Sequence, residues 1–159
     1  MDKAKELIDD LVKRYDPNLI YNMDEAGLFW QMEPDRSLVT LEEGEVRGTK
    51  KQKQRITLAI CSNLTGRDKV KLWVIGKNKT PRSFKNWKVE RFVEWSWNKI
   101  AWMTGDNFNS YLEWFDKHVA SKHKQKVVLL LDNAPAHKVK SSLKWTNVVF
   151  LPPNVTSIV

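Results

Sequence analysis

Asp132 directly follows the apolar run Val127–Leu131 and precedes the turn-forming segment Asn133–His137. Five consecutive Val and Leu residues predict a strand that is buried on both faces of a sheet. A carboxylate at the end of such a strand is costly unless a metal ion, a proton or a partner meets its charge. Because the strand also gives this acid a rigid base, we interpret Asp132 as a site residue.

A second acid has the same setting, since the apolar-leaning segment Leu19–Met23 leads into Asp24 and Glu25. If the two strands are neighbours, the carboxylates of Asp24 and Asp132 converge, and at about 4 Å and an effective dielectric of about 20 they repel by roughly 4 kcal/mol. A divalent cation between them turns that cost into binding energy, and ligation by oxygen alone suits Mg²⁺ or Mn²⁺. For either Asp alone, capping of a turn is an equally good explanation. Glu25 is expected to point to the opposite face of the strand, so it is not counted as a ligand.

Length and composition limit the class of protein. The 159 residues suffice for one domain with a core, and 42% hydrophobic and 29% charged residues are ordinary globular values. Cys61 is the single cysteine, which allows no internal disulfide and fits a reducing compartment. Because the sequence shows neither a signal peptide nor an apolar stretch of about 20 residues, we expect an intracellular protein with no membrane partner.

The formal net charge of +8 points toward nucleic acid. Cationic segments attract phosphate backbones and release counterions on binding, although a solvated basic loop without a partner is the alternative. Together with a carboxylate site, the charge favours a nucleic-acid substrate. The candidate DNA-binding cations lie in residues 47–55, and further cations follow at 77–82: Lys50, Lys51, Lys53 and Arg55, then Lys77, Lys79 and Arg82.

The remaining pattern predicts alternating helices and strands. Apolar residues at helical spacing predict an amphipathic helix that ends before Pro17, and a second helix is expected to begin with Asp106 as N-cap. The Asp24 strand is expected to form a hairpin with residues 27–31, and a long polar loop is expected at 33–53. This order is typical of an α/β fold, a ribonuclease-H-like mixed sheet flanked by helices. Further strands are expected at 55–62, 70–75, 127–131 and 148–151.

Aromatic and histidine residues receive structural interpretations. The segment 87–102 contains five Trp and Phe residues, and we interpret it as an aromatic core beneath a loop in preference to a base-stacking surface. His118 and His123 are expected at the surface. With no cysteine pair and no close histidine pair, a zinc site is not expected.

Four segments resemble the pogo/Tigger-type transposases, whose catalytic domain belongs to the DDE superfamily of ribonuclease-H-like nucleases. The likeness runs from about residue 18 to the end. The same domain occurs in domesticated relatives, including centromere-binding and jerky-type proteins, so the resemblance bears on ancestry more than on present activity. The matching segments are Tyr21–Leu28, Lys53–Leu58, Leu129–His137 and Phe150–Ser157.

The resemblance implies a role for individual residues. Asp24 corresponds to the first catalytic carboxylate and Asp132 to the second, and in the complete family site such acids hold two Mg²⁺ or Mn²⁺ ions that serve DNA phosphodiester cleavage and strand transfer. Asn133 and His137 lie in the second motif as candidates for contacting DNA or supporting the metal ligands, and a structural role in the turn is equally open. The family further implies DNA as partner, a nuclear location and a homo-oligomer in a full-length context.

The family also requires a third acid, but residues 133–159 contain neither Asp nor Glu. We therefore expect residues 1–17 to be an N-terminal helix and lead-in, and residues 18–159 to be a C-terminally incomplete catalytic core, truncated before the third acid. Such a chain is expected to be inactive as an endonuclease or transposase on its own. The alternatives are a domesticated, non-enzymatic DNA- or chromatin-binding protein and, with less support, a nuclease that acts on another nucleic acid.

Overall fold

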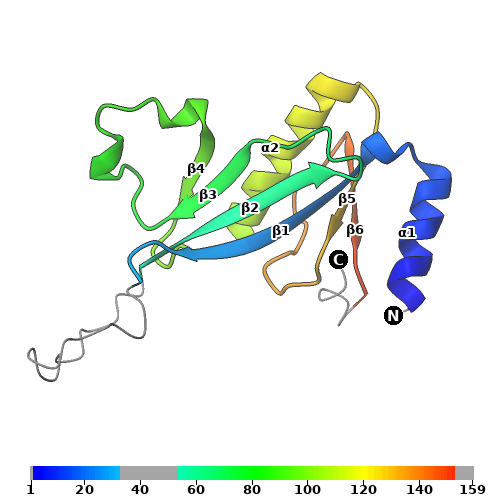
Figure 1. Ribbon diagram of the computed structural model, residues 1–159, viewed down its shortest axis with the longest axis horizontal. Coiled ribbons are helices and arrows are strands. Elements are labelled where there is room, and N and C mark those ends of the chain that lie inside the picture. Colours follow the sequence, from blue (N-terminus) through cyan, green and yellow to red (C-terminus); the bar gives the residue numbers. More distant parts are fainter. Residues whose placement is uncertain (1, 33–53, 153–159) are drawn as a thin grey trace, which may run out of the picture.

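The structure is a computed structural model that describes residues 2–32 and 54–152. A six-stranded sheet forms the centre of the molecule, and two α-helices and three short 3₁₀ helices accompany it (Figure 1). The elements in chain order are α1 (Asp2–Arg14), η1 (Pro17–Leu19), β1 (Ile20–Phe29), β2 (Arg55–Asn63), β3 (Leu72–Gly76), η2 (Arg82–Phe84), η3 (Val89–Arg91), β4 (Val93–Trp97), α2 (Gly105–His123), β5 (Val127–Leu131) and β6 (Thr146–Phe150).

The strand order in the sheet is β4-β3-β2-β1-β5-β6. Strands β1, β2 and β3 form an antiparallel meander, whereas β5 lies parallel to β1 and β6 parallel to β5. The antiparallel meander thus comes first in the chain, β4 then adds parallel to β3 at one edge, and the parallel strands β5 and β6 follow α2. This mixed sheet confirms the predicted α/β class.

Strand β1 is longer than the sequence suggested. A hairpin between the Asp24 strand and residues 27–31 was expected, but this prediction is wrong because β1 continues without a turn to Phe29. Its antiparallel partner is β2, in an unbroken register that runs from Tyr21 opposite Asn63 to Phe29 opposite Arg55. Asp24 therefore lies in the middle of a long strand rather than at its end.

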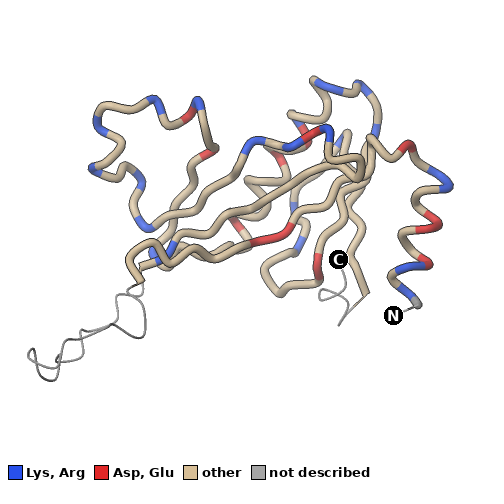
Figure 2. The backbone as a smooth tube through the Cα atoms, viewed as in Figure 1, with Lys and Arg blue, Asp and Glu red and all other residues tan. Residues whose placement is uncertain are grey.

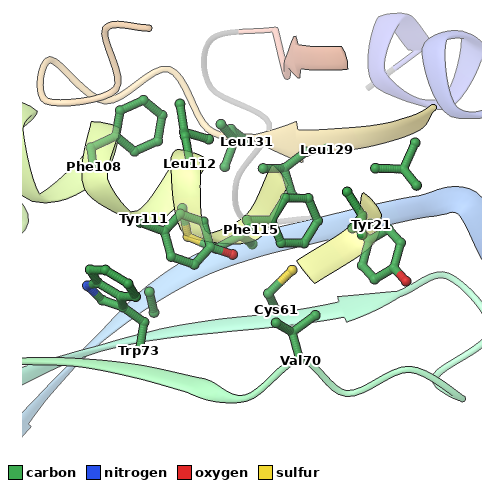
Figure 3. Packing of buried hydrophobic residues seen from close by; sticks show 14 of the residues in the cluster. Tyr21, Cys61, Val70, Trp73, Phe108, Tyr111, Leu112, Phe115, Leu129 and Leu131 are labelled. Atoms are coloured by element: carbon green, nitrogen blue, oxygen red, sulfur yellow. The ribbon is translucent and has the colours of Figure 1, made fainter. Parts of the chain in front are cut away.

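One face of the sheet packs on α2 and forms the main hydrophobic core (Figure 3). The predicted second helix is present, and the side chains of its apolar face are fully buried. The N-cap of α2 is Thr104, whose hydroxyl accepts a hydrogen bond from the Asn107 backbone N–H. The helix therefore begins earlier than expected, and the prediction of Asp106 as N-cap is wrong. The buried residues of α2 in this core are Phe108, Tyr111, Leu112, Phe115 and Val119.

The opposite face is only partly covered. Helix α1 packs Leu11 against the first residues of β1 and against β5, where Ile20, Val128 and Leu130 form a smaller cluster with it. Beyond this cluster the same face of β1 and β2 is open, and the side chain of Ile60 is 52% exposed there. The sheet therefore presents one packed face and one face that is available to a partner.

The aromatic segment 87–102 does not form a core, so that interpretation is wrong for most of its residues. Trp95 packs against neighbouring residues, but the other large aromatic side chains are between 48% and 69% exposed. The physical reason is that β4 lies at the edge of the sheet, where α2 does not reach all of its side chains. The exposed members are Trp87, Phe92, Trp97 and Trp102.

None of the helices in residues 2–32 and 54–152 combines the length and the hydropathy that crossing a bilayer requires.

Candidate metal centre

The parallel pairing of β1 and β5 brings the two candidate acids together. Asn22 on β1 lies opposite Leu130 on β5, and the same register continued by two residues places Asp24 level with Asp132. Neighbouring strands in a sheet are about 4.8 Å apart. The sheet topology therefore favours convergence of these two acids, but Asp132 does not line the pocket that Asp24 lines.

Asp24 faces solvent on the open face of the sheet. Its Oδ1 accepts a hydrogen bond of 2.8 Å from the Glu25 backbone N–H, which fixes one carboxylate oxygen. The carboxylate lines an open pocket of about 310 Å³ together with side chains from β1 and β2. A phosphate group or a hydrated cation can reach it there. The other lining residues of this pocket include Asn22, Ile60, Ser62 and Asn63.

Asp132 is half-buried directly after β5. Its Oδ1 is fully buried and lies 2.6 Å from Nδ1 of His137, but that nitrogen is better directed at the backbone carbonyl of Asp132, at 3.2 Å. The carboxylate oxygen consequently accepts no well-formed hydrogen bond from the described part of the chain. A buried carboxylate oxygen is costly unless a cation meets it, and the nearest candidate among the described residues is the imidazole of His137.

His137 connects Asp132 to β1. The imidazole is buried, stacks on the Phe108 ring at a centroid distance of 4.6 Å, and places Nε2 2.6 Å from Oε1 of Glu25. Burial lowers the pKa of His137, but the hydrogen bond to Glu25 and that to the Asp132 carbonyl outweigh burial, so its pKa lies above the ordinary value of 6.5. His137 therefore tends to carry a positive charge between the two carboxylates.

Glu25 has a role that the sequence did not reveal. The expectation that it points away from Asp24 rested on strand alternation, and β1 does continue through both residues. On the α2 face, Glu25 meets His137 and is 25% exposed. Two adjacent acids within a strand must face opposite sides of the sheet, and the partly buried one then needs a cationic partner; this signal could have directed attention to His137.

The two Asp residues fit a hydrated cation. The parts of the chain that the structure describes contain no group of three or more His, Cys, Asp or Glu side chains that could hold a metal ion by themselves. Mg²⁺, however, usually keeps several waters and binds through one or two carboxylates and the phosphates of its substrate. Asp24, which is exposed, could serve as one such carboxylate, whereas Oδ1 of Asp132 lies 2.6 Å from Nδ1 of His137 and would have to share that contact with a cation.

The candidate DNA-binding residues have different settings. Asn133 is exposed in the turn after β5, close in sequence to Asp132. Arg55 is engaged within the protein: its guanidinium lies 3.7 Å from the centre of the Trp102 ring and donates to Oγ1 of Thr57 at 3.0 Å. The other three candidates, Lys50, Lys51 and Lys53, lie outside the described residues.

A second ionic cluster joins the turn between β2 and β3 to α2. Asp68, which is buried, accepts hydrogen bonds from Lys122 and from the Tyr21 hydroxyl, and Nε2 of His123 lies 2.6 Å from that hydroxyl oxygen. His118 and His123 are partly buried around Asp68, so the prediction that they lie at the surface is wrong. Sequence spacing gave no sign of this cluster, because Asp68 and Lys122 are far apart along the chain.

The fold and the paired acids define the class of protein as a ribonuclease-H-like domain. The structure is similar to the Mos1 mariner paired-end complex with Mn, with a TM-score of 0.52 and 13% sequence identity over 87% of this chain and 36% of that chain. It is also similar to the corresponding complex with Mg, with a TM-score of 0.51 and 14% identity over the same shares. At these identities the likeness concerns the fold alone.

Residues 53–159 match the family described as DDE superfamily endonuclease, and the chain belongs to this family. It is 38% identical to CENP-B homolog protein 2 of Schizosaccharomyces pombe, over 95% of this chain and 30% of the relative. It is 35% identical to Tigger transposable element-derived protein 4 of Mus musculus, over 90% and 27%, and 34% identical to the Jerky protein homolog of Homo sapiens, over 88% and 26%. The chain thus spans less than a third of the length of these relatives.

Proposed function

We propose that this chain is the core of a transposon-derived DDE protein that holds DNA against a divalent-cation site formed by Asp24 and Asp132. The observation that carries the proposal is the parallel pairing of β1 with β5, because its register, paired as far as Asn22 opposite Leu130, would bring Asp24 and Asp132 level if it continued by two residues. The match to the DDE superfamily endonuclease family, over residues 53–159, includes Asp132 and supports a role for that residue. A nuclear location and DNA as partner belong to this proposal, as does assembly into a homo-oligomer in a full-length context.

Asp24 and Asp132 would bind Mg²⁺ or Mn²⁺, two ions in a complete family site. Such ions activate a water or a DNA 3′-hydroxyl and stabilise the leaving oxygen in phosphodiester cleavage and strand transfer. The protein's own groups hold the ligands in place: β1 and β5 fix the backbone positions, and His137, itself held by Glu25, keeps the Asp132 side chain close to the sheet. Asn133 at the rim is positioned to contact a DNA phosphate.

The 159-residue polypeptide supplies two acids to this site, since residues 133–159 contain neither Asp nor Glu. Two carboxylates bind a cation weakly and leave a two-ion site short of anionic ligands. We therefore expect cation binding without efficient cleavage by this polypeptide. Nicking of duplex DNA that requires Mg²⁺ or Mn²⁺ and is abolished by Asp24→Asn would contradict this part of the proposal.

Mn²⁺ binding, followed by electron paramagnetic resonance of the free ion, tests the site directly. The wild-type chain is expected to bind Mn²⁺ weakly, and Asp24→Asn and Asp132→Asn are each expected to reduce the affinity about tenfold or more, because each removes one of two anionic ligands. Asp9→Asn is the matched control, since Asp9 is an exposed acid on α1 and its loss changes the net charge by the same amount. Equal affinities in all four proteins would refute the site.

A non-enzymatic DNA-binding function is the second candidate. The net charge of +8 favours it. It predicts salt-sensitive DNA binding that does not change when Mg²⁺ is added or when Asp24 is replaced by Asn. Fluorescence anisotropy with duplex DNA, with and without Mg²⁺, separates this function from the cation-dependent one.

A further inference from the structure

A second pocket lies on the open face of the sheet, away from the two acids. It has a volume of about 390 Å³, within the range of roughly 300–1,000 Å³ that is typical of small-molecule sites. Three aromatic side chains from separate elements line it: Trp30 after β1, Phe84 in η2 and Trp95 in β4. Flat aromatic walls of this kind suit a planar ring.

The aromatic walls are fixed by local packing. Phe84 and Trp95 meet edge to face at a centroid distance of 4.7 Å, and the Trp95 indole N–H donates to the backbone carbonyl of Asn78 at 3.2 Å. Trp95 lies directly over Gly76, where an added Cβ would overlap its ring. Trp30, in contrast, is 54% exposed and faces solvent at the pocket's edge. Two walls are thus rigid and the third is accessible.

The segment that carries one side of this pocket is strongly basic. We call residues 77–92, between β3 and β4, the arm. Figure 2 shows Lys and Arg distributed along it. Its single acid is Glu90, and all six of its cations are exposed: Lys77, Lys79, Arg82, Lys85, Lys88 and Arg91. A polyanion is therefore the partner whose charge complements the arm.

The pocket and the cation site share one face of the sheet. Asp24 and Leu28 are four residues apart on β1, so their side chains point to the same side. Ile56, which lines the pocket, lies opposite Leu28. At about 3.3 Å per residue, the pocket begins about 13 Å from Asp24, which corresponds to about four stacked nucleotides of one strand.

We propose that this pocket binds one unpaired base of a DNA strand whose phosphates lie along the arm. A base in a duplex is stacked and cannot enter between aromatic walls, so the occupant must be single-stranded or locally unpaired. The inference rests on the proposed function for the identity of the nucleic acid and for the direction of the strand toward Asp24. The pocket itself requires no metal.

Binding of a fluorescein-labelled, single-stranded DNA of about 12 nucleotides, measured by anisotropy in EDTA, tests the proposal with the intact 159-residue chain. Trp30→Ala is expected to weaken binding about 5- to 150-fold, the range for loss of one base–aromatic stack. Trp87→Ala is the matched control, because Trp87 lies on the arm, is 69% exposed and is not part of the pocket. It is expected to change the affinity less than twofold. Circular dichroism establishes that both variants are folded.

Photocrosslinking of wild-type protein to the same DNA carrying 5-iodouracil needs no substitution and is expected to label peptides that contain Trp30, Phe84 or Trp95. Three outcomes overturn the proposal: equal effects of Trp30→Ala and Trp87→Ala, duplex binding as tight as single-strand binding, or crosslinks elsewhere. Single-stranded RNA that competes as well as DNA would overturn the assignment to DNA. Because EDTA removes the metal, none of these outcomes depends on the cation site, which Mn²⁺ binding tests separately.

Discussion

The adjacent acids Asp24 and Glu25 on β1 face opposite sides of the sheet. Asp24 is exposed on the open face, whereas Glu25 reaches the α2 face and contacts His137. His137 in turn lies against Asp132, so Glu25 supports the second acid from the far side of the strand. Adjacent positions on β1 thus carry a candidate metal ligand, Asp24, and a residue that contacts His137, Glu25.

Glu25→Gln is expected to lower the pKa of His137. Burial already lowers this pKa, and the hydrogen bond to the Glu25 carboxylate is the largest influence that raises it. The protonated imidazole stabilises the fold fully below its unfolded pKa of about 6.5, and this contribution is lost as pH rises through the higher folded pKa. In the variant this loss should occur at lower pH.

Titration of the His137 imidazole by ¹⁵N-resolved NMR measures the change. Glu6→Gln on α1 serves as the control, since Glu6 is exposed and makes the same change of charge far from the site. An unchanged pKa of His137 in Glu25→Gln would show that the contact with Glu25 does not form in solution.

Sequence reasoning identified the two Asp residues but not their support. Asp24 and Asp132 stand out because each interrupts or ends an apolar run. The pair Glu25 and His137 does not, because 112 residues separate them and only the pairing of β1 with β5 brings them together. Arg55 was predicted to contact DNA because it belongs to a basic segment. In the structure its guanidinium stacks on Trp102 within the protein.

At the level of elements, the unexpected length of β1 has a local cause. Gly27 is a common turn signal, and it led to the expected hairpin at residues 27–31. In the structure this glycine leaves room for the Arg55 guanidinium instead, since an added Cβ would lie 2.7 Å from its Nη2 and the arginine side chain would have to move. A single sequence does not distinguish these two uses of glycine, because the distinction depends on the partner strand.

The ionic cluster around Asp68 ties the turn between β2 and β3 to α2, and its strength should depend on pH. Burial raises the pKa of Asp68, but hydrogen bonds from Lys122 and Tyr21, together with the charges of Lys122 and His118, lower it below its ordinary value of 3.8. Ionised Asp68 therefore stabilises the fold above pH 3.8, and this contribution is lost as pH falls through the lower folded pKa.

Asp68→Asn is accordingly expected to reduce the free energy of unfolding by about 2 kcal/mol at pH 7, since charged hydrogen bonds within the protein are weakened. The difference from wild type should narrow as the pH falls below 3.8. Urea unfolding at several pH values measures it. Asp10→Asn, which removes an exposed ion pair with Arg14, should cost less than about 0.5 kcal/mol. A difference for Asp68→Asn that stays constant down to pH 3 would contradict the pKa shift.

In the whole molecule, the two faces of the sheet differ in burial: one packs on α2, and the other is largely open. The α2 face holds the main core, and the open face carries the pocket lined by Asp24 and the aromatic pocket. The order of helices and strands predicted the α/β fold because burial and alternation are local patterns. The exposure of Trp97 on β4 was not predictable in this way, since it depends on β4 being an edge strand that pairs in parallel with β3.

The contribution of the arm to DNA binding can be measured separately from that of other basic residues, because the two groups lie in different parts of the molecule. Figure 1 places the arm and α1 at opposite ends of the sheet. For single strands, the logarithm of the binding constant falls with the logarithm of salt concentration by about 0.7 per phosphate neutralised. Lys77→Ala and Lys79→Ala are each expected to reduce this slope by about 0.7, whereas Lys13→Ala on α1 should leave it unchanged.

Anisotropy titrations of single-stranded DNA across a range of salt concentrations measure these slopes. Trp30→Ala should weaken binding at every salt concentration without altering the slope, because stacking releases no counterions. Affinity and slope therefore report on the pocket and the arm independently. If the arm variants keep the wild-type slope while Lys13→Ala reduces it, the DNA strand lies over α1, and the path from the arm to Asp24 is wrong.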